Sequence, residues 1–268
     1  MKKNVFALAL CAVLSLSLLS ACGGKESATI KVGASPTPHA QILEVAKEIL
    51  AKDNITLEIV PYDDYVLPNT NVEDGQLDAN YFQHITYMNN FNTNDGTHLV
   101  SVADLHYEPF GIYAGKSASL DALPDGAQIA IPDDPTNGGR ALLLLQEQGL
   151  IKLKDGVGLE PTVEDIAENP HDYKIKQLTA NLLTTTLQDV DVAVINGNYA
   201  IGAGLKASEA LAIESADGIA GTAYVNVLAV KEGRENDETI KALIKALTSD
   251  EVKAFIDETY GGGVVAVF

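Results

Sequence analysis

The stretch 29–60 constrains the fold more than any other part of the chain, because it reads as a strand, a helix and a second strand in direct succession. Residues 29–34 read as a short strand that ends in a turn. Apolar residues within 42–49 recur at helical spacing. Residues 55–60 alternate as a strand does. This order predicts two parallel strands with a right-handed crossover. Ligands bind beyond the carboxyl ends of such strands, so segment 33–39 is a candidate binding loop.

A second strand, turn and helix lie within 129–145, where the apolar strand 129–131 gives way to a proline-containing turn and a leucine-rich helix. Thr136 or Asn137 is the expected N-cap of this helix. The two glycines that follow leave backbone N–H groups unshielded at the helix N-terminus. Such N–H groups, together with the helix dipole, favour an anion.

Arg140 comes next and is one of only two arginines in the chain. A cation in the first turn of a helix is unfavourable, because the helix dipole prefers acidic groups there. An anionic ligand would remove this conflict, and a guanidinium can hold a carboxylate by two parallel hydrogen bonds. The pattern therefore indicates a carboxylate-binding residue, although an exposed arginine that caps a surface turn is compatible with the same residues.

The remaining alternation of strands and helices predicts an α/β protein with two lobes. Lobe 1 is expected to span 29–110 and 228–268, and lobe 2 to span 112–225. The acidic stretch 152–170 is expected to form a helix and a loop. Two strands that cross between the lobes would make a hinge of the periplasmic-binding-protein kind, with a ligand cleft between the lobes.

The N-terminus reads as a secretion signal. Two lysines precede an apolar run, 6–19, which is too short to span a membrane comfortably. The sequence 19–22, Leu-Ser-Ala-Cys, resembles the lipobox of bacterial lipoproteins. This resemblance implies a signal peptide over 1–21, lipid attachment at Cys22, and a small, polar tether over 22–28. An ordinary signal peptide with a chance cysteine is the alternative. A lipidated chain would be anchored on the extracytoplasmic face of a membrane, either periplasmic or at the cell surface.

The net charge of the chain limits the classes of molecule that it can bind. The chain carries a net charge of −19, and removal of the signal leaves 16 basic against 37 acidic residues, or −21. Such a surface repels nucleic acid and anionic headgroups. We therefore expect no nucleic-acid partner, and contact with the membrane only through the lipid.

Sequence patterns for catalysis are absent. The chain contains no HExxH, GxSxG or CxxC pattern, so we expect a protein that is not an enzyme and that has no cofactor and no resident metal. Spacing along the chain does not exclude an active site assembled in space. Five histidines are scattered along the sequence, and three that met in the cleft would bind a metal together with a carboxylate.

With these features in hand, the chain resembles the methionine-binding lipoproteins of bacterial ABC importers over essentially its whole mature length. The resemblance is carried by the segments Leu77-Asp78-Ala79-Asn80-Tyr81-Phe82-Gln83-His84, Glu108-Pro109-Phe110-Gly111-Ile112-Tyr113, Asp134-Pro135-Thr136-Asn137-Gly138-Gly139-Arg140-Ala141-Leu142, Asn196-Gly197-Asn198-Tyr199-Ala200 and Tyr224-Val225-Asn226. Asp133 departs from the pattern, since many relatives are expected to have asparagine there.

The resemblance implies roles for particular residues. Arg140 would bind the ligand carboxylate, and the amide oxygens of Asn198 and Asn226 would accept hydrogen bonds from its ammonium group. The thioether would be enclosed by Tyr81, Phe82 and His106, with Asn137 and Tyr199 as further ligand contacts.

The implied function is capture of methionine, L- and possibly D-, between two closing lobes and its delivery to an ABC permease and its ATPase. Three alternatives use the same fold: a methionine-containing dipeptide, another amino acid or a metal ion as ligand. An enzyme or a surface interaction protein is the alternative from a different class.

Overall fold

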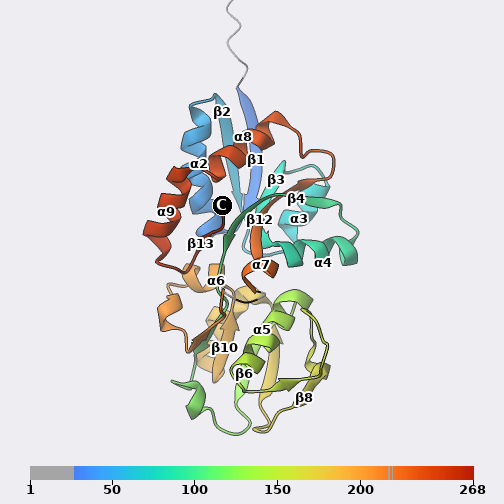
Figure 1. Ribbon diagram of the computed structural model, residues 1–268, viewed down its shortest axis with the longest axis vertical. Coiled ribbons are helices and arrows are strands. Elements are labelled where there is room, and N and C mark those ends of the chain that lie inside the picture. The colour runs from blue at the N-terminus through green and yellow to red at the C-terminus, as the bar shows by residue number, and fades with distance from the viewer. Residues whose placement is uncertain (1–26, 217, 219) are drawn as a thin grey trace, which may run out of the picture.

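The computed structural model describes residues 27–216, 218 and 220–268, which form two α/β lobes arranged end to end (Figure 1). The predicted signal peptide 1–21, Cys22 and all but the last two residues of the predicted tether lie outside the described residues. Each lobe is built around its own sheet, which confirms the predicted two-lobed α/β class. None of the helices in the described part of the chain is both long and apolar enough to cross a bilayer.

Lobe 1 contains a six-stranded sheet in the order β13-β4-β12-β3-β1-β2. Its strands are β1 (Ala28–Ala34), β2 (Ile55–Pro61), β3 (Ala79–His84), β4 (Leu99–Tyr107), β12 (Val225–Lys231) and β13 (Val265–Ala266). β1 pairs in parallel with both β2 and β3, so the parallel pairing predicted for the first strands is confirmed. β12 runs antiparallel to both of its neighbours, β3 and β4.

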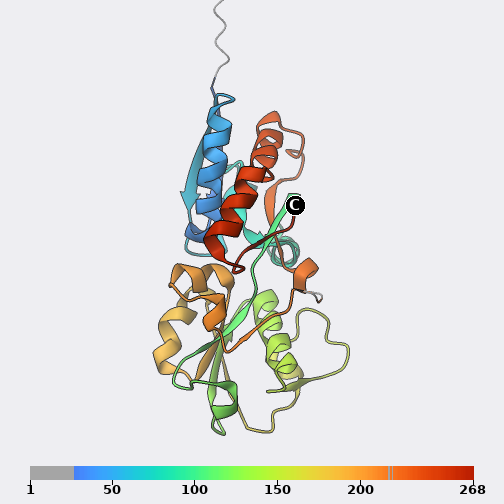
Figure 2. The same ribbon diagram turned by 60° about the vertical axis from the view of Figure 1, so that its left-hand side comes forward.

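The helices of lobe 1 come from both the N-terminal and the C-terminal part of the chain. They are η1 (Pro36–Ala40), α2 (Gln41–Ala51), α3 (Leu67–Glu73), α4 (Ile85–Asp95), α8 (Glu238–Leu247) and α9 (Asp250–Tyr260). α2 buries Ile42 and Leu43 against Leu243 of α8 and Ile256 of α9, in one apolar core with the sheet. Figure 2 shows α2 beside these C-terminal helices. The C-terminal segment 238–268 therefore packs into lobe 1.

Lobe 2 contains a five-stranded sheet in the order β11-β5-β10-β6-β9. Its strands are β5 (Gly111–Ala114), β6 (Gln128–Pro132), β9 (Lys174–Leu178), β10 (Val192–Ile195) and β11 (Ala212–Ile213). Its helices are η2 (Leu120–Ala122), α5 (Pro135–Glu147), η3 (Val163–Asp165), η4 (Ala180–Asp189), α6 (Gly197–Gly202) and η5 (Ala207–Glu209). Apolar residues of β6, α5 and β10, such as Ile129, Leu145 and Val194, pack together in its main core.

The prediction of a helix within 152–170 is wrong. This segment instead forms a short hairpin, β7 (Lys152–Leu153) with β8 (Ile166–Glu168), and the single helical turn η3 lies between the two strands. Gly156 and Gly158 have φ angles of +78° and +69°, which interrupt a right-handed helix. The segment also offers no continuous apolar stripe that a helix could bury.

The chain crosses between the two sheets at two places (Figure 1). The first crossing, 108–110, joins β4 to β5, and the second, 214–224, joins β11 to β12 and contains α7 (Ala220–Ala223). β12 pairs with lobe 1 along its whole length, so the sheet of lobe 1 resumes at Val225 rather than at the predicted residue 228.

Candidate functional site

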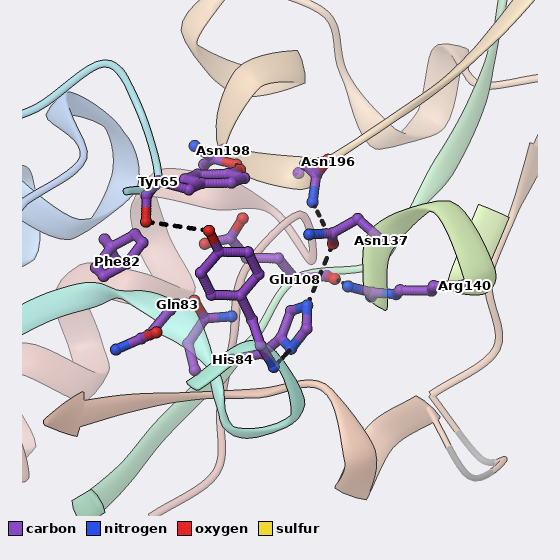
Figure 3. Close-up of a pocket in the computed structure, with 12 residues that line it drawn as sticks. Tyr65, Phe82, Gln83, His84, Glu108, Asn137, Arg140, Asn196 and Asn198 are labelled. Atoms are coloured by element: carbon purple, nitrogen blue, oxygen red, sulfur yellow. Dashed lines mark hydrogen bonds between the residues drawn. The ribbon is translucent and has the colours of Figure 1, made fainter. Parts of the chain in front are cut away.

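A hollow lies between the lobes, and we call it the cleft pocket (Figure 3). It is lined by Tyr65, Phe82, Gln83, His84, Tyr87, Glu108, Asn137, Arg140, Asn196, Gly197, Asn198 and Asn226. Many of these residues lie at the carboxyl end of a strand or at the start of a helix, where open α/β sheets place their ligands.

Arg140 reaches the cleft pocket from α5. Asp134, rather than Thr136 or Asn137, caps this helix: its carboxylate accepts a hydrogen bond from the backbone N–H of Asn137 at 2.9 Å. The helix therefore begins at Pro135, and Arg140 lies in the second turn, not in the first turn as predicted. The expected conflict with the helix dipole is correspondingly weaker.

The charge of Arg140 is balanced by Glu214, which follows β11. Nε of Arg140 lies 3.0 Å from Oε1 of Glu214, and Nη2 donates to the backbone oxygen of Glu108 at 2.9 Å. Burial by itself would lower the pKa of Arg140, but the Glu214 carboxylate outweighs burial and raises it. Tyr107 adds a hydrogen bond from its hydroxyl to Glu214 at 2.6 Å. This guanidinium is therefore held rigidly as a cation at one end of the pocket.

Asn137 links three parts of the cleft pocket. Its Oδ1 accepts hydrogen bonds from Asn196 Nδ2 at 2.8 Å and from His84 Nε2 at 3.2 Å. Its Nδ2 donates to the carboxylate of Asp134 at 3.0 Å. His84 belongs to lobe 1 and Asn137 to lobe 2, so this contact closes one side of the cleft. Asp133, the departure from the family pattern, is exposed and does not line the cleft pocket.

The two predicted amide acceptors, Asn198 and Asn226, both line the cleft pocket. Oδ1 of Asn198 accepts a hydrogen bond from the Tyr65 hydroxyl at 2.6 Å, across the cleft. Oδ1 of Asn226 accepts from His39 Nε2 at 2.9 Å. An amide oxygen has two lone pairs, so each of these oxygens can accept one further hydrogen bond from a ligand.

Aromatic rings form the apolar wall of the cleft pocket. The ring of Phe82 lies 5.8 Å from the ring of Tyr65 and 6.1 Å from that of Tyr87, measured between centroids. Tyr87 donates a hydrogen bond to the backbone oxygen of Tyr65 at 3.1 Å, which holds the two tyrosines together. Such a wall suits an apolar or thioether side chain.

Tyr81 and His106, which were predicted to enclose the thioether, do not line the cleft pocket. Successive side chains of a strand point to opposite faces, so Phe82 faces the cleft while Tyr81 is buried in the core of lobe 1. The Tyr81 hydroxyl is hydrogen-bonded to Nδ1 of His106, and His106 Nε2 lies 2.7 Å from Oε1 of Glu108. These two residues therefore form a layer behind Glu108.

Tyr199 was also predicted to contact the ligand, but it lies outside the cleft pocket. Its ring packs against Tyr65 with 5.1 Å between centroids, and its hydroxyl donates to the backbone oxygen of Asp63 at 2.8 Å. Tyr199 comes from lobe 2 and Asp63 from lobe 1, so Tyr199 supports the wall of the pocket and joins the lobes.

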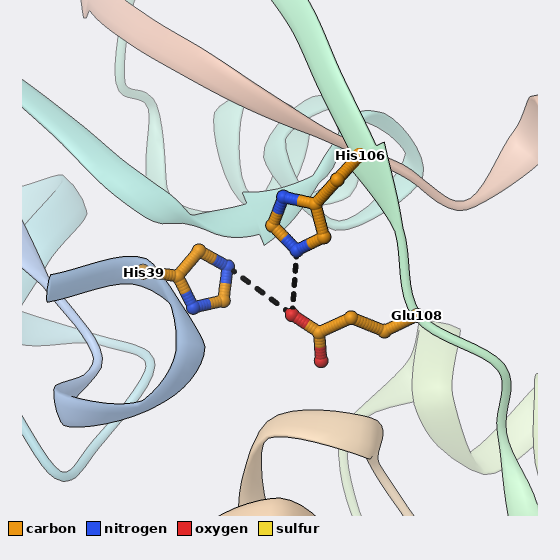
Figure 4. A group of neighbouring side chains, drawn as sticks. All are labelled: His39, His106 and Glu108. Atoms are coloured by element: carbon orange, nitrogen blue, oxygen red, sulfur yellow. Dashed lines mark hydrogen bonds and ion pairs between the residues drawn. The ribbon is translucent and has the colours of Figure 1, made fainter. Parts of the chain in front are cut away.

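One group of three potential metal ligands occurs among the described residues: His39, His106 and Glu108 (Figure 4). Ligand atoms around a tetrahedral metal lie roughly 3.4 Å apart. The 2.7 Å between His106 Nε2 and Glu108 Oε1 is instead the length of a direct hydrogen bond. Metal-bound histidines donate their second N–H to a partner, whereas Nδ1 of buried His39 has none among the described residues. The group therefore favours a hydrogen-bonded chain over a metal site.

The buried histidines of the site are neutral at physiological pH. Burial lowers the pKa of His39 to about 4 and that of His106 to about 3. Burial also lowers the pKa of His84 to about 3, and the nearby charge of Arg140 contributes to this shift. Neutral imidazoles carry one donor and one acceptor nitrogen each, which suits their hydrogen bonds here.

Several lining residues were not predicted as ligand contacts: Tyr65, Gln83, His84, Tyr87, Glu108, Asn196 and Gly197. The position of strand ends was a usable signal for His84, Glu108 and Asn196, because each ends or directly follows a strand. Tyr65 lies in the loop after β2, and Glu214 reaches the site only through the fold, so neither has a local signal.

The chain is similar in sequence to known bacterial lipoproteins over almost its whole length. Membrane lipoprotein TpN32 of Treponema pallidum is 40% identical to this chain over 266 residues, covering 98% of both. The D-methionine-binding lipoprotein MetQ of Escherichia coli O157:H7 is 43% identical over 258 residues, 94% of this chain and 93% of that protein.

Solved structures give the same result. A putative lipoprotein from Ruminococcus gnavus superposes with a TM-score of 0.88 at 53% identity, covering 90% of this chain and 99% of the other. A nutrient-binding protein from Burkholderia cenocepacia bound to methionine gives a TM-score of 0.85 at 42% identity, covering 89% and 100%. A family model described as NlpA lipoprotein matches residues 30–268, and the chain therefore belongs to the NlpA lipoprotein family.

Proposed function

We propose that this protein is a lipid-anchored solute-binding protein that captures methionine in the cleft pocket and delivers it to an ABC permease. The observation that carries the proposal is the layout of the pocket, in which a buried arginine, two amide oxygens and an aromatic wall line one hollow between two lobes. A relative that is 43% identical is named a D-methionine-binding lipoprotein, and the Burkholderia cenocepacia structure has methionine bound. Both support methionine as the ligand.

The polar groups suit the two charged ends of an amino acid. Arg140 binds the ligand carboxylate, for which the pair with Glu214 leaves Nη1 unused. Asn198 and Asn226 accept hydrogen bonds from the ammonium group through Oδ1. Hydrogen bonds to charged groups contribute about 1.5–3 kcal/mol each.

The apolar groups suit the side chain. Phe82, Tyr65 and Tyr87 enclose the thioether, and burial of such a side chain contributes about 1.5–3 kcal/mol. Micromolar affinity corresponds to about −8 kcal/mol. The charged contacts and the closure of the lobes therefore contribute most of the binding free energy.

Closure links binding to delivery, and no chemical step is involved. Two units, 28–107 with 225–268 and 111–213, act as lobes that swing about the crossing segments 108–110 and 214–224. The ligand stabilises the closed form because only that form contacts it from both lobes. The closed form then docks on a permease driven by its ATPase, while lipid at Cys22 keeps the protein on the extracytoplasmic face of the membrane.

The test is calorimetric titration of purified protein that has been unfolded, dialysed and refolded to remove copurified ligand. L-methionine, D-methionine, glycyl-methionine and leucine are titrated separately. One-to-one binding of a methionine form, with leucine much weaker, is the expected result. Absence of heat and of any thermal shift with all methionine forms would refute the proposal and direct the search to other amino acids.

A further inference from the structure

We propose that Glu108 selects ligands that carry a free α-ammonium group, and that His39 and His106 act as positioning residues that hold its carboxylate for this role. The inference rests on the proposed function, because it assigns the ammonium end of the amino acid a third and charged acceptor. It concerns which ligands the cleft pocket admits, beyond the identity of the side chain that the pocket encloses.

Glu108 lies where a ligand group between the lobes can reach it. It belongs to the first crossing segment, lines the cleft pocket and is only 5% exposed. α6 of lobe 2 approaches it so closely that a Cβ on Gly197 would lie 2.9 Å from Oε2 of Glu108. The backbone N–H of Asn198 lowers the pKa of the same carboxylate, against the effect of burial. Glu108 therefore lies next to Asn198, one of the two amide acceptors.

A chain of hydrogen bonds fixes Oε1 of Glu108 from the other side (Figure 4). His106 Nε2 lies 2.7 Å from this oxygen, and the Tyr81 hydroxyl is bonded to Nδ1 of the same ring. With Tyr81 as donor to Nδ1, the proton of His106 is on Nε2 and is donated to Glu108. The carboxylate thus receives a donor from a neutral ring that is itself held in place.

His39 connects Glu108 to the second amide acceptor. Its Nε2 lies 2.9 Å from Oδ1 of Asn226 and 3.5 Å from Oε1 of Glu108. Asn226 Oδ1 can only accept, so Nε2 carries the proton and faces both oxygens. His39 thereby fixes the distance between Oε1 of Glu108 and Oδ1 of Asn226, which belong to different elements.

The balance of charges gives the selectivity. Arg140 is already paired with Glu214, whereas the ion-pair contacts of Glu108 among the described residues are to the two imidazoles alone. Both imidazoles are neutral at physiological pH, because burial lowers their pKa. Burial also raises the pKa of Glu108, and the charge of Arg140, which bonds the Glu108 backbone oxygen rather than its carboxylate, opposes this shift only in part. A ligand ammonium supplies that cation in a site of low dielectric constant.

The test compares L-methionine with 4-(methylthio)butanoate, which has the same carboxylate and thioether but no amino group. Wild-type protein should bind L-methionine at least about 100-fold more tightly, since a ligand that leaves buried polar groups unpaired is strongly rejected. Glu108→Gln should bind L-methionine about tenfold more weakly and should change the affinity for the analogue much less. Glu168→Gln is the matched control, because Glu168 is an exposed carboxylate paired with Lys152 on the far hairpin.

The positioning role has its own readout. His39→Gln and His106→Gln should each reduce the ratio of the two affinities, whereas a purely structural role would lower the melting temperature and leave that ratio unchanged. Far-UV circular dichroism and thermal unfolding establish that each variant is folded before it is titrated.

Three results would overturn the inference. Wild-type protein that binds the analogue as tightly as L-methionine refutes it without any variant. A folded Glu108→Gln protein with the wild-type ratio refutes it while the proposed function stands. Zinc ions that bind with loss of methionine affinity, and only when both histidines are present, would show that Glu108 holds a metal instead. If wild-type protein binds neither ligand, the proposed function and this inference both fail.

Discussion

Arg140 and Glu214 form an ion pair that is buried on both sides, with side chains only 4% and 8% exposed. The two residues are far apart in sequence, and Nε of Arg140 lies 3.0 Å from Oε1 of Glu214. Removal of one partner of a buried pair leaves an uncompensated charge and costs about 3–5 kcal/mol of stability. Alanine at either position would therefore lower both methionine affinity and stability. More conservative substitutions are needed to test binding alone.

Arg140→Lys keeps the charge but loses the planar fork that pairs with Glu214 and leaves Nη1 for a ligand oxygen. We expect methionine affinity to fall about tenfold, since a lysine ammonium cannot keep the two bonds to Glu214 and also present a further N–H to the ligand carboxylate as Nη1 does. Isothermal titration calorimetry measures this change. Arg234→Lys is the matched control, because Arg234 pairs with Asp78 and Asp237 in lobe 1, away from the cleft pocket. Wild-type affinity in Arg140→Lys would contradict the assigned role.

Gly197→Ala tests the close approach of α6 to the first crossing segment. The added Cβ would lie 2.8 Å from Cβ of Glu108, so the helix or the glutamate must shift. We expect a loss of about 1–3 kcal/mol in the free energy of unfolding, as for other overpacked sites, together with weaker methionine binding. Gly202→Ala, in the same helix, meets no atom within 4 Å and should change neither quantity appreciably. Equal effects of the two variants in urea unfolding would rule out this reading.

Tyr65→Phe removes a hydrogen bond that crosses the cleft. The Tyr65 hydroxyl donates to Asn198 Oδ1 at 2.6 Å, so its loss weakens closure and leaves a ligand acceptor less well placed. A net loss of about 1 kcal/mol corresponds to roughly fivefold weaker methionine binding by calorimetry. Tyr62→Phe is the control, because its hydroxyl accepts from Asn71 within lobe 1. The idea fails if both variants bind methionine as the wild type does.

His84 should make stability depend on pH. Its pKa is lowered from 6.5 to about 3, first by burial and then by the charge of Arg140. The unfolded chain takes up this proton as the pH falls below 6.5, but the folded protein does not. Stability is therefore fully present above pH 6.5 and falls with pH below it, by about 1.4 kcal/mol per pH unit for this residue.

His84→Gln removes that contribution, so the variant should lose less stability than the wild type between about pH 7.5 and about pH 5. Urea unfolding at both pH values measures the difference, and groups common to both proteins cancel in the comparison. Parallel losses of stability would show that His84 titrates alike in the folded and unfolded chains.

The sheets were predictable from the sequence because their signals are local. Residues 29–34 and 55–60 carry the apolar pattern of strands, and their parallel pairing is confirmed as β1 with β2. The residues of β10 likewise show a continuous apolar run that is fully buried. By contrast, the hairpin of β7 and β8 depends on glycine conformations that composition alone did not indicate.

The site was only partly predictable, for reasons that differ from residue to residue. Arg140, Asn198 and Asn226 occupy the cleft pocket as expected, but their role toward a ligand stays a prediction. Tyr81 and Phe82 were both predicted to enclose the thioether, whereas the alternation of a strand sends their side chains to opposite faces. Glu214 was missed because only the folded chain brings it to Arg140.

The guanidinium of Arg140 also lies between two rings, 4.7 Å from the centroid of Phe110 and 4.2 Å from that of Tyr224. Phe110 ends one crossing segment and Tyr224 ends the other, so the cation lies beside both crossing segments. A point on an axis moves least when two bodies rotate about it. Under the proposed function, we therefore expect the ligand carboxylate to be bound at Arg140 while the lobes are still apart, and the ammonium group to be contacted only when they close.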